Sequence, residues 1–162
     1  MILLADEEDD RALDDSPDMS ENEIQFRVMG EPIPQGSIRA FITKSGRPIL
    51  THSNRNLKEW RNRIAHEGQA RRPPQWDMEN AILINIDFIM PRPKSLPKKV
   101  LEDVKRPDLD KLVRAVLDGL TSIYYNDDSQ VVGIFASKKY AGKNVPPGVE
   151  IRIIPNPVRG DG

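Results

Sequence analysis

The chain is organised around one stretch, residues 106–120, which reads RPDLDKLVRAVLDGL. Its large apolar residues recur at intervals of three and four, the spacing of an amphipathic helix that buries one side. Asp108 is a natural N-cap for this helix, and Asp110, Arg114 and Asp118 lie four residues apart on its polar side. The apolar side, which we expect to enter the core, consists of Leu109, Leu112, Val113, Val116, Leu117 and Leu120.

A second acidic pair, Asp127 and Asp128, follows in a turn just before an apolar strand. Together with Asp108 and Asp110, this pair places carboxylates on two elements that are close in sequence, and such a set can bind a hard cation. Mg²⁺ prefers oxygen ligands and usually keeps several waters beside a few carboxylates and a substrate phosphate. The residues therefore suit a Mg²⁺ site, with Arg114 one helical turn away as the cation that offsets transition-state charge.

Each piece of this pattern also has a simpler explanation. Asp108 can serve only as an N-cap, and Asp110 with Arg114 can form an ordinary ion pair along a helix. The residues around Asp127 and Asp128 are also typical of turns. Spacing alone leaves open whether the carboxylates cluster, although clustered carboxylates repel one another unless a cation neutralises them. The residues by themselves support the hypothesis of a Mg²⁺-dependent domain that binds polyanions.

The composition narrows the class of protein. The 162 residues suit one domain with a real core, and the lack of cysteine excludes disulfides and thiolate metal sites. With two histidines in the chain, a zinc site built on imidazole is not expected. No apolar run is long enough to span a membrane, and the N-terminus does not resemble a signal peptide. We therefore expect a soluble, cytoplasmic protein with no membrane partner.

The net charge of −1 hides a strong asymmetry. Residues 1–23 contain ten Asp and Glu residues and one Arg, which gives −9, whereas residues 24–162 contain fifteen Asp and Glu residues and 23 Lys and Arg residues, which gives +8. We expect a disordered acidic tail at 1–22, a single folded domain at 23–157 and a disordered C-terminus at 158–162. A basic domain favours polyanionic partners. The tail either aids solubility or competes with nucleic acid for the basic surface.

Periodicity and turn signals predict one series of elements, with no repeats and no second core. The expected elements are a strand at 24–29, a hairpin at 38–43 and 48–51, a helix capped by residue 53 or 54 and running to about 70, a strand at 81–90, the helix at 109–120, and strands at 130–136 and 149–154. Basic residues lie on the hairpin and in the proline-rich loop at 91–107. They can contact phosphates, although exposed basic hairpins often contact only water.

The motifs resemble the RusA family of Holliday junction resolvases, which are homodimeric, Mg²⁺-dependent endonucleases. The resemblance covers roughly residues 82–154 and implies an α/β (α+β) fold, with a small mixed β-sheet, helices packed on one face, and a homodimer. A two-fold dimer would present two sites to a nearly two-fold symmetric four-way junction. The motifs that carry the resemblance are Asp108-Leu109-Asp110-x-Leu112 with basic Arg114, Leu117-Asp118-x-Leu120, and Asp127-Asp128-Ser129-Gln130-Val131-Val132.

By motif position, the resemblance assigns Asp108, Asp110 and Asp128 to catalysis and to binding of Mg²⁺, with Mn²⁺ as an alternative. Asp127 adjoins the third aspartate and is expected to assist in metal binding. Arg114 stands where the family has a catalytic lysine, which is a departure from the pattern. Arginine keeps the positive charge but cannot donate a proton near neutral pH, so we expect an electrostatic role for Arg114.

The residues expected to bind DNA come from several basic segments. Lys111 replaces the asparagine usual after the second aspartate, and Lys138 stands where family members often have a basic residue after the strand. Lys105 and Arg106 belong to the basic loop at 91–107. Arg39 lies on the predicted hairpin.

The resulting hypothesis is a structure-selective endodeoxyribonuclease of bacterial, prophage or phage origin. It would resolve Holliday junctions in DNA recombination and repair through paired, Mg²⁺-dependent hydrolysis of phosphodiester bonds. One alternative is a non-enzymatic dimer that binds branched DNA, and another is a broader nuclease that cuts flaps or forks. A phosphohydrolase for small molecules suits the basic loops poorly.

Overall fold

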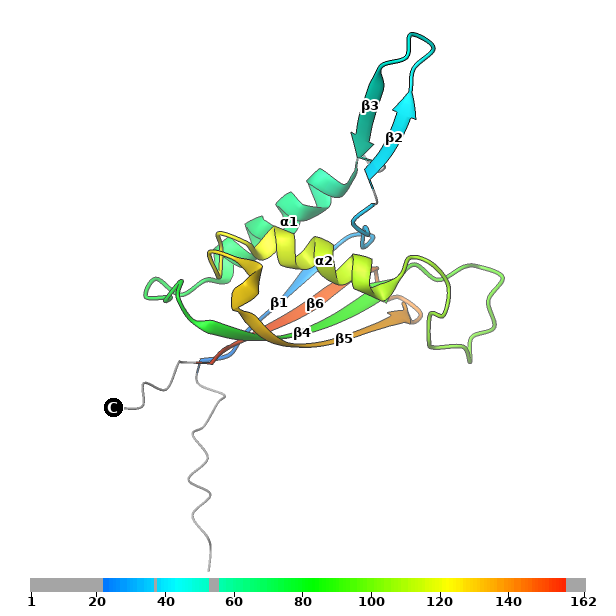
Figure 1. Cartoon of the computed structure of the whole chain (residues 1–162). Coiled ribbons are helices and arrows are strands. Elements are labelled where there is room, and N and C mark those ends of the chain that lie inside the picture. The colour runs from blue at the N-terminus through cyan, green and yellow to red at the C-terminus, as the bar shows by residue number, and fades with distance from the viewer. Residues whose placement is uncertain (1–21, 37, 53–55, 157–162) are drawn as a thin grey trace, which may run out of the picture.

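The computed structural model describes residues 22–36, 38–52 and 56–156 (Figure 1). The tail expected at 1–22, apart from residue 22, the helix cap expected at residue 53 or 54, and the C-terminus expected at 158–162 lie outside these ranges. In chain order, the elements are β1 (Ile24–Met29), β2 (Ile38–Ile42), β3 (Pro48–His52), α1 (Asn56–Arg71), β4 (Ala81–Met90), α2 (Leu109–Leu120), the short 3₁₀ helix η1 (Asp128–Gln130), β5 (Val131–Tyr140) and β6 (Gly148–Asn156).

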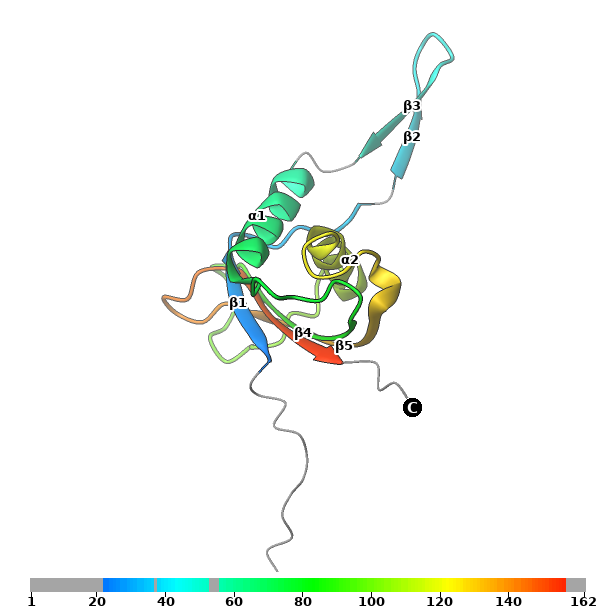
Figure 2. The same cartoon turned by 90° about the vertical axis from the view of Figure 1, so that its left-hand side faces the viewer.

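The main sheet has four strands in the order β1-β6-β4-β5. Strand β6 is antiparallel to both β1 and β4, whereas β5 is parallel to β4, so the sheet is mixed. Helices α1 and α2 lie on one face of this sheet (Figure 2). The expected α+β architecture is therefore confirmed. No helix in the described ranges has the length and apolar character needed to cross a membrane.

The core forms between the helices and the inner face of the sheet. Alternate residues of β4, from Ile82 to Phe88, are buried there, as the period of two in a strand requires. The two helices cross closely, since a Cβ placed on Gly119 of α2 would lie 3.0 Å from Ile64 Cγ2. The buried side of α1 consists of Leu57, Trp60, Ile64 and Gly68.

One sequence prediction needs correction, and one feature of α2 was not predicted. Strand β5 does not end at residue 136, because it stays in parallel register with β4 as far as the pair Met90–Tyr140, and Lys138 therefore lies within the strand. The apolar side of α2 also divides into two rows. The fully buried row consists of Leu112, Val116 and Leu120. The neighbouring row is only partly covered and consists of Leu109, Val113 and Leu117.

The connection from β4 to α2 runs through the basic loop at 91–107, which is attached to the end of β5. The Tyr140 backbone N–H donates to the Leu101 carbonyl at 2.9 Å. Asp103 is buried in this loop and accepts from the Lys105 backbone N–H at 2.9 Å. The loop thus carries its basic residues on an anchored path that leads into α2.

Candidate active site

The N-terminus of α2 presents the first two aspartates of the motif. Asp108 occupies the N-cap position with extended backbone (φ −68°, ψ 139°), but its side chain forms no capping hydrogen bond. Asp110 follows in the first turn, and both residues are exposed. The explanation of Asp108 as only a helix cap is therefore not supported, because its carboxylate satisfies no backbone N–H of the helix.

Lys138 holds the segment that leads into this helix. Its ammonium donates to the carbonyl of Pro107 at 2.8 Å and also to the carbonyl of Lys105. A lysine on β5 thereby ties the chain just before Asp108 to the sheet. The structure gives Lys138 a positioning contact within the protein, and its role in DNA binding stays a prediction.

The second acidic pair lies in a hydrogen-bonded turn at the start of η1. Asp127 is the N-cap, and its Oδ1 accepts from the Ser129 backbone N–H at 2.8 Å. Hydrogen bonds from the Ser129 side chain and backbone lower the pKa of the exposed Asp127 carboxyl. The Asp127 carboxylate is therefore engaged in the turn, while Asp128, one residue further along, lines the adjoining surface hollow.

Gln130 fixes this turn with its whole side-chain amide, a role that was not predicted from the sequence. Its Oε1 accepts from the backbone N–H groups of Asn126 at 2.8 Å and Asp127 at 3.1 Å. Its Nε2 donates to the carbonyls of Met78 at 2.8 Å and Asn80 at 3.0 Å. The spacing Asp127-x-x-Gln130 is that of a capping box, and this signal would have identified the bonds made by Oε1.

The two acidic elements meet at one open hollow of about 490 Å³, which we call the acidic hollow. Asp110 and Arg114 line it from α2, and Asp128 lines it from η1. Its remaining wall is apolar and includes the partly covered row of α2. The apolar lining residues are Leu109, Val113, Leu117 and Ala136.

The charged groups that line the acidic hollow form no ion pairs with one another within the described residues. No ion pair joins Asp110 to Arg114 in the described part of the chain, so the explanation of these residues as a helical ion pair is not supported. Asp118, the next acid along this side of α2, instead pairs with Arg61 at 3.1 Å. Arg114 is therefore available to a ligand in the acidic hollow.

The structure brings together only part of the expected ligand set. Asp110 and Asp128 share the acidic hollow, whereas Asp108 is not among its lining residues. Within the described residues, no three Asp, Glu, His or Cys side chains come close enough to form a metal site. Two carboxylates on different elements, beside a surface open to a phosphate ester, nevertheless fit Mg²⁺, which typically takes one or two carboxylates plus substrate phosphates and waters.

Tyr125 lies beneath the site and links its two halves. Its side chain is fully buried, and its hydroxyl donates to the Leu117 carbonyl of α2 at 2.7 Å. Burial raises the pKa of Tyr125, and the negative charges of Asp128 and Asp118 raise it further. Tyr125 thus remains a neutral hydrogen-bond donor that holds the chain before η1 against α2.

Of the other residues expected to bind DNA, three lie just before α2 or in its first turn. Lys105 and Arg106 are exposed at the end of the anchored basic loop, and Lys111 is half-buried in the first turn of α2. The backbone of Arg39 belongs to β2, but its side chain lies outside the described part of the structure. The DNA contacts assigned to these residues stay predictions.

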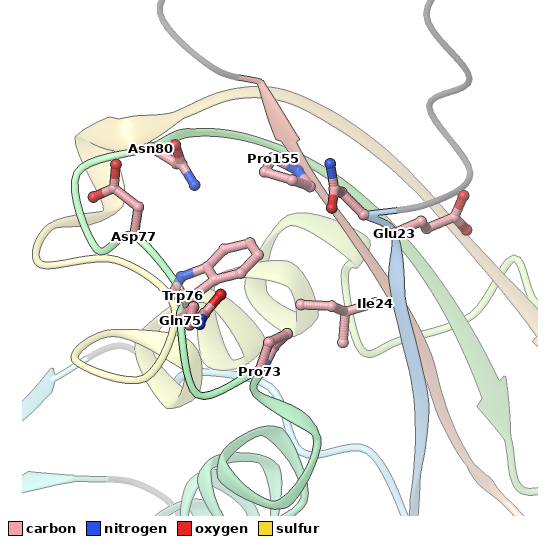
Figure 3. A pocket seen from close by; sticks show the side chains of 9 residues that line it. Glu23, Ile24, Pro73, Gln75, Trp76, Asp77, Asn80 and Pro155 are labelled. Carbon is pink, nitrogen blue, oxygen red and sulfur yellow. The ribbon is translucent and has the colours of Figure 1, made fainter.

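A second pocket, of about 470 Å³, opens between the start of β1 and the loop that follows α1 (Figure 3). Its tryptophan, Trp76, uses the indole N–H to donate to the Tyr124 carbonyl at 2.8 Å. Of its carboxylates, Glu23 pairs with Arg152, and Asp77 accepts from a backbone N–H in its own loop. The described residues that line this pocket include no Lys or Arg, so the acidic hollow is the better candidate for phosphate chemistry.

The fold and the acidic hollow define a small α+β protein whose candidate site combines two carboxylates with a guanidinium group. A family model described as "Endodeoxyribonuclease RusA" matches residues 30–154, and the chain belongs to this family. The resemblance seen in the motifs is thereby confirmed, and family membership indicates an endodeoxyribonuclease. The chain is also 30% identical over 140 residues to "Uncharacterized protein YqaN" of Bacillus subtilis (strain 168), a match that covers 80% of this chain and 94% of that protein.

Proposed function

We propose that the protein is a structure-selective endodeoxyribonuclease that resolves Holliday junctions during DNA recombination and repair in the cytoplasm. The observation that carries this proposal is the meeting of Asp110, Asp128 and Arg114 at one hollow, in a chain that belongs to the RusA family. The nuclease domain would comprise residues 23–157, between an acidic tail at 1–22 and the C-terminal segment at 158–162.

Asp110 and Asp128 would hold Mg²⁺, or Mn²⁺ in its place, with Asp108 as a further ligand and Asp127 assisting beside it. When bound, the ion would polarise the scissile phosphate and lower the pKa of a bound water. The lack of any capping bond from Asp108 supports this role, because its carboxylate remains available. The hydrogen bonds of Asp127 within the turn favour a secondary role for that residue.

Arg114 would bind the phosphate and stabilise the charge that accumulates in the transition state. A guanidinium presents paired donors that match phosphate oxygens, and it remains charged at any physiological pH. The exposed position of Arg114 in the acidic hollow and its freedom from Asp110 support an electrostatic role. The proton for the leaving oxygen would come from water rather than from Arg114.

Branched DNA would be recognised through phosphates and shape rather than through base edges. The chain beyond the acidic N-terminal segment is strongly basic, at +8 over residues 24–162. The residues proposed to contact the DNA backbone are Lys105, Arg106, Lys111, Lys138 and Arg39.

A homodimer would supply the two active sites that paired nicking requires. Strand β5 is an edge of the main sheet, and its Val132, Ile134 and Phe135 are 59%, 47% and 67% exposed. An edge strand with several exposed apolar residues is typical of an association surface. We therefore propose that two copies meet along β5, beside the apolar wall of the acidic hollow.

The test is a nicking assay on a synthetic four-way junction, a flap, a fork and a plain duplex, each with Mg²⁺ and with EDTA. We expect Mg²⁺-dependent nicks in opposing strands of the junction and little cutting of the duplex. Stronger cutting of flaps or forks would favour the broader nuclease. Tight junction binding with no cleavage in Mg²⁺ or Mn²⁺ would favour the non-enzymatic alternative.

A further inference from the structure

The β2–β3 hairpin stands apart from the rest of the molecule. Its strands pair only with each other, from Ile38–His52 to Ile42–Pro48, and form a separate two-stranded sheet. Both views show it projecting away from the helical layer (Figures 1 and 2). An isolated two-stranded hairpin is at best marginally stable in water, so a binding partner is expected to stabilise this one.

Both faces of the hairpin expose a large apolar side chain. Ile42 is 80% exposed and Ile49 is 47% exposed. Ile49 pairs with Phe41, the residue before Ile42, and neighbouring residues of a strand point to opposite faces. A partner that surrounds the hairpin would therefore cover apolar surface on each side.

The charge of this region favours an anionic partner. Residues 32–58 contain no Asp or Glu and five basic residues, although acids make up 25 of the 162 residues in the chain. Lys44 and Arg47 flank the exposed tip of the hairpin, and neither forms an ion pair within the described residues. The basic residues of this segment are Arg39, Lys44, Arg47, Arg55 and Lys58.

The segment before the hairpin is attached to the helix that carries the candidate site. The Gln35 backbone N–H donates to the Lys111 carbonyl of α2 at 3.0 Å. Arg61 of α1 donates to Gln35 Oε1 at 2.8 Å and to Asp118 Oδ2 at 3.1 Å. The chain that leads into β2 is thus fixed to the first turn of α2, next to Asp110.

We propose that the β2–β3 hairpin is a DNA-binding arm that grips the backbone of a duplex branch next to the cleavage site. Lys44 and Arg47 contact phosphates, and Ile42 and Ile49 pack on the sugars and on bases exposed where the branches separate. This inference rests on the proposed function, because it assigns the surface that holds the substrate of the same site. A second copy of the chain is the competing occupant.

The first test removes the two charges at the tip, in the double variant K44A/R47A. Junction affinity is measured in EDTA over a series of salt concentrations, so that no cleavage occurs. We expect affinity to fall about 10-fold or more and the slope of log K against log salt to decrease by about 2, since each phosphate contact contributes about one unit.

The matched control is K143A/R71A, which removes the same charge from exposed positions outside the hairpin. We expect this control to keep nearly the full salt slope of the wild type. Equal losses in the two double variants, or no loss in K44A/R47A, would overturn the proposal. Nicking of the junction by wild-type protein tests the proposed function separately, so the arm can fail while the nuclease assignment stands.

The second test separates DNA from a second copy as the occupant of the apolar residues. The variant I42S keeps every charge of the hairpin and alters only an exposed side chain. We expect weaker junction binding, by about 3-fold to 10-fold, which corresponds to partial loss of one buried aliphatic contact. Sedimentation should give an unchanged oligomeric state, and a shift of I42S toward monomer would overturn the DNA assignment.

Discussion

The acidic hollow and the β2–β3 hairpin are built in opposite ways. The turn beside Asp128 is fixed by four hydrogen bonds of the Gln130 amide, and the segment before Asp108 is tied to β5 by Lys138. The strands of the β2–β3 hairpin pair only with each other. Chemistry at a site requires preorganised groups, whereas an arm that only holds substrate can settle when the DNA binds.

Substitutions in the two regions should therefore impair different functions, namely the rate of nicking and the binding of the junction. A substitution of a carboxylate in the acidic hollow should lower the rate of nicking and leave junction binding nearly intact. A substitution at the tip of the β2–β3 hairpin should weaken junction binding and its dependence on salt. Variants that mix the two effects would show that the two regions are not independent.

The largest effect among the supporting groups is expected for Arg114. The variant R114A should nick a bound junction about 10²-fold to 10³-fold more slowly, the loss typical of removing one preorganised electrostatic group. R114K should recover much of the rate, because it restores the charge. The measurement is single-turnover cleavage at saturating protein, and an unchanged rate in R114A would remove Arg114 from the site.

Substitution of Gln130 should lower the nicking rate less than R114A does, by an amount that depends on the Mg²⁺ concentration. Q130A frees the turn that carries Asp128, and groups that orient metal ligands typically contribute about 10-fold to 100-fold in metal affinity or activity. We expect a higher Mg²⁺ concentration for half-maximal nicking and weaker binding of Mn²⁺ to the protein alone. Q130E should be intermediate, because it keeps the acceptor for two backbone N–H groups but loses the donor to Met78 and Asn80.

The control for Gln130 is Q75A in the loop that follows α1, which removes a glutamine from the second pocket. Q75A should keep the wild-type requirement for Mg²⁺. If Q130A shows the same Mn²⁺ affinity as Q75A, Gln130 supports the fold and does not position Asp128. Melting temperatures of both variants, measured without metal, separate a loss of stability from a loss of positioning.

The smallest effect concerns pH and lies in the core beside the second pocket, where the Tyr124 ring packs edge-on against Trp76. Burial raises the pKa of Tyr124 to about 12 from its usual 10, and its hydroxyl donates to the Gly68 carbonyl at 2.7 Å. The stability that this phenol contributes is therefore present below pH 10 and is lost as the pH rises from 10 toward 12. The free energy of unfolding should fall by up to about 2 kcal/mol over this range because of Tyr124.

The matched variant for the pH effect is Y124F, measured by chemical denaturation at several alkaline pH values. Y124F should be less stable than the wild type near neutral pH, because it removes the hydrogen bond from the Tyr124 hydroxyl to the Gly68 carbonyl and leaves that carbonyl with the Arg72 backbone N–H as its remaining donor. The difference in the free energy of unfolding between the wild type and Y124F should become smaller as the pH rises above the usual pKa of tyrosine. If this difference stayed constant throughout the alkaline range, the ionisation of the Tyr124 phenol would not be coupled to unfolding.

Much of the fold was predictable because local periodicity reports burial. Alternating apolar residues predicted β1 and β4 with the bounds that the structure shows, Ile24–Met29 and Ala81–Met90. The end of β5 was not predictable in this way, since Ser137-Lys138-Lys139 looks like a polar exit from a strand. Pairing with β4, which lies far earlier in the chain, keeps these residues in the sheet.

In the candidate site too, features set by local sequence were predictable, whereas features set by tertiary contacts were not. The acidic motifs predicted which aspartates to examine, and the structure places Asp110 and Asp128 at one hollow. The partial exposure of Val113 was not predictable, because helical periodicity does not distinguish the apolar row that meets a sheet from the row that lines a hollow. The contacts of Gln130 with Met78 and Asn80 also depend on tertiary structure, since these partners precede β4 in the chain.

The most direct test of the central claim is cleavage of a four-way junction in Mg²⁺ by the variant Asp110→Asn. Nicking should fall by at least about 10²-fold, because a charge that holds the metal is lost. Junction binding should be kept or improved, because a carboxylate that repels phosphates is removed. The control Asp87→Asn, whose wild-type side chain accepts from Ser137 Oγ at 2.6 Å outside the acidic hollow, should cut normally. Cleavage by Asp110→Asn at the wild-type rate would contradict the assignment of the active site.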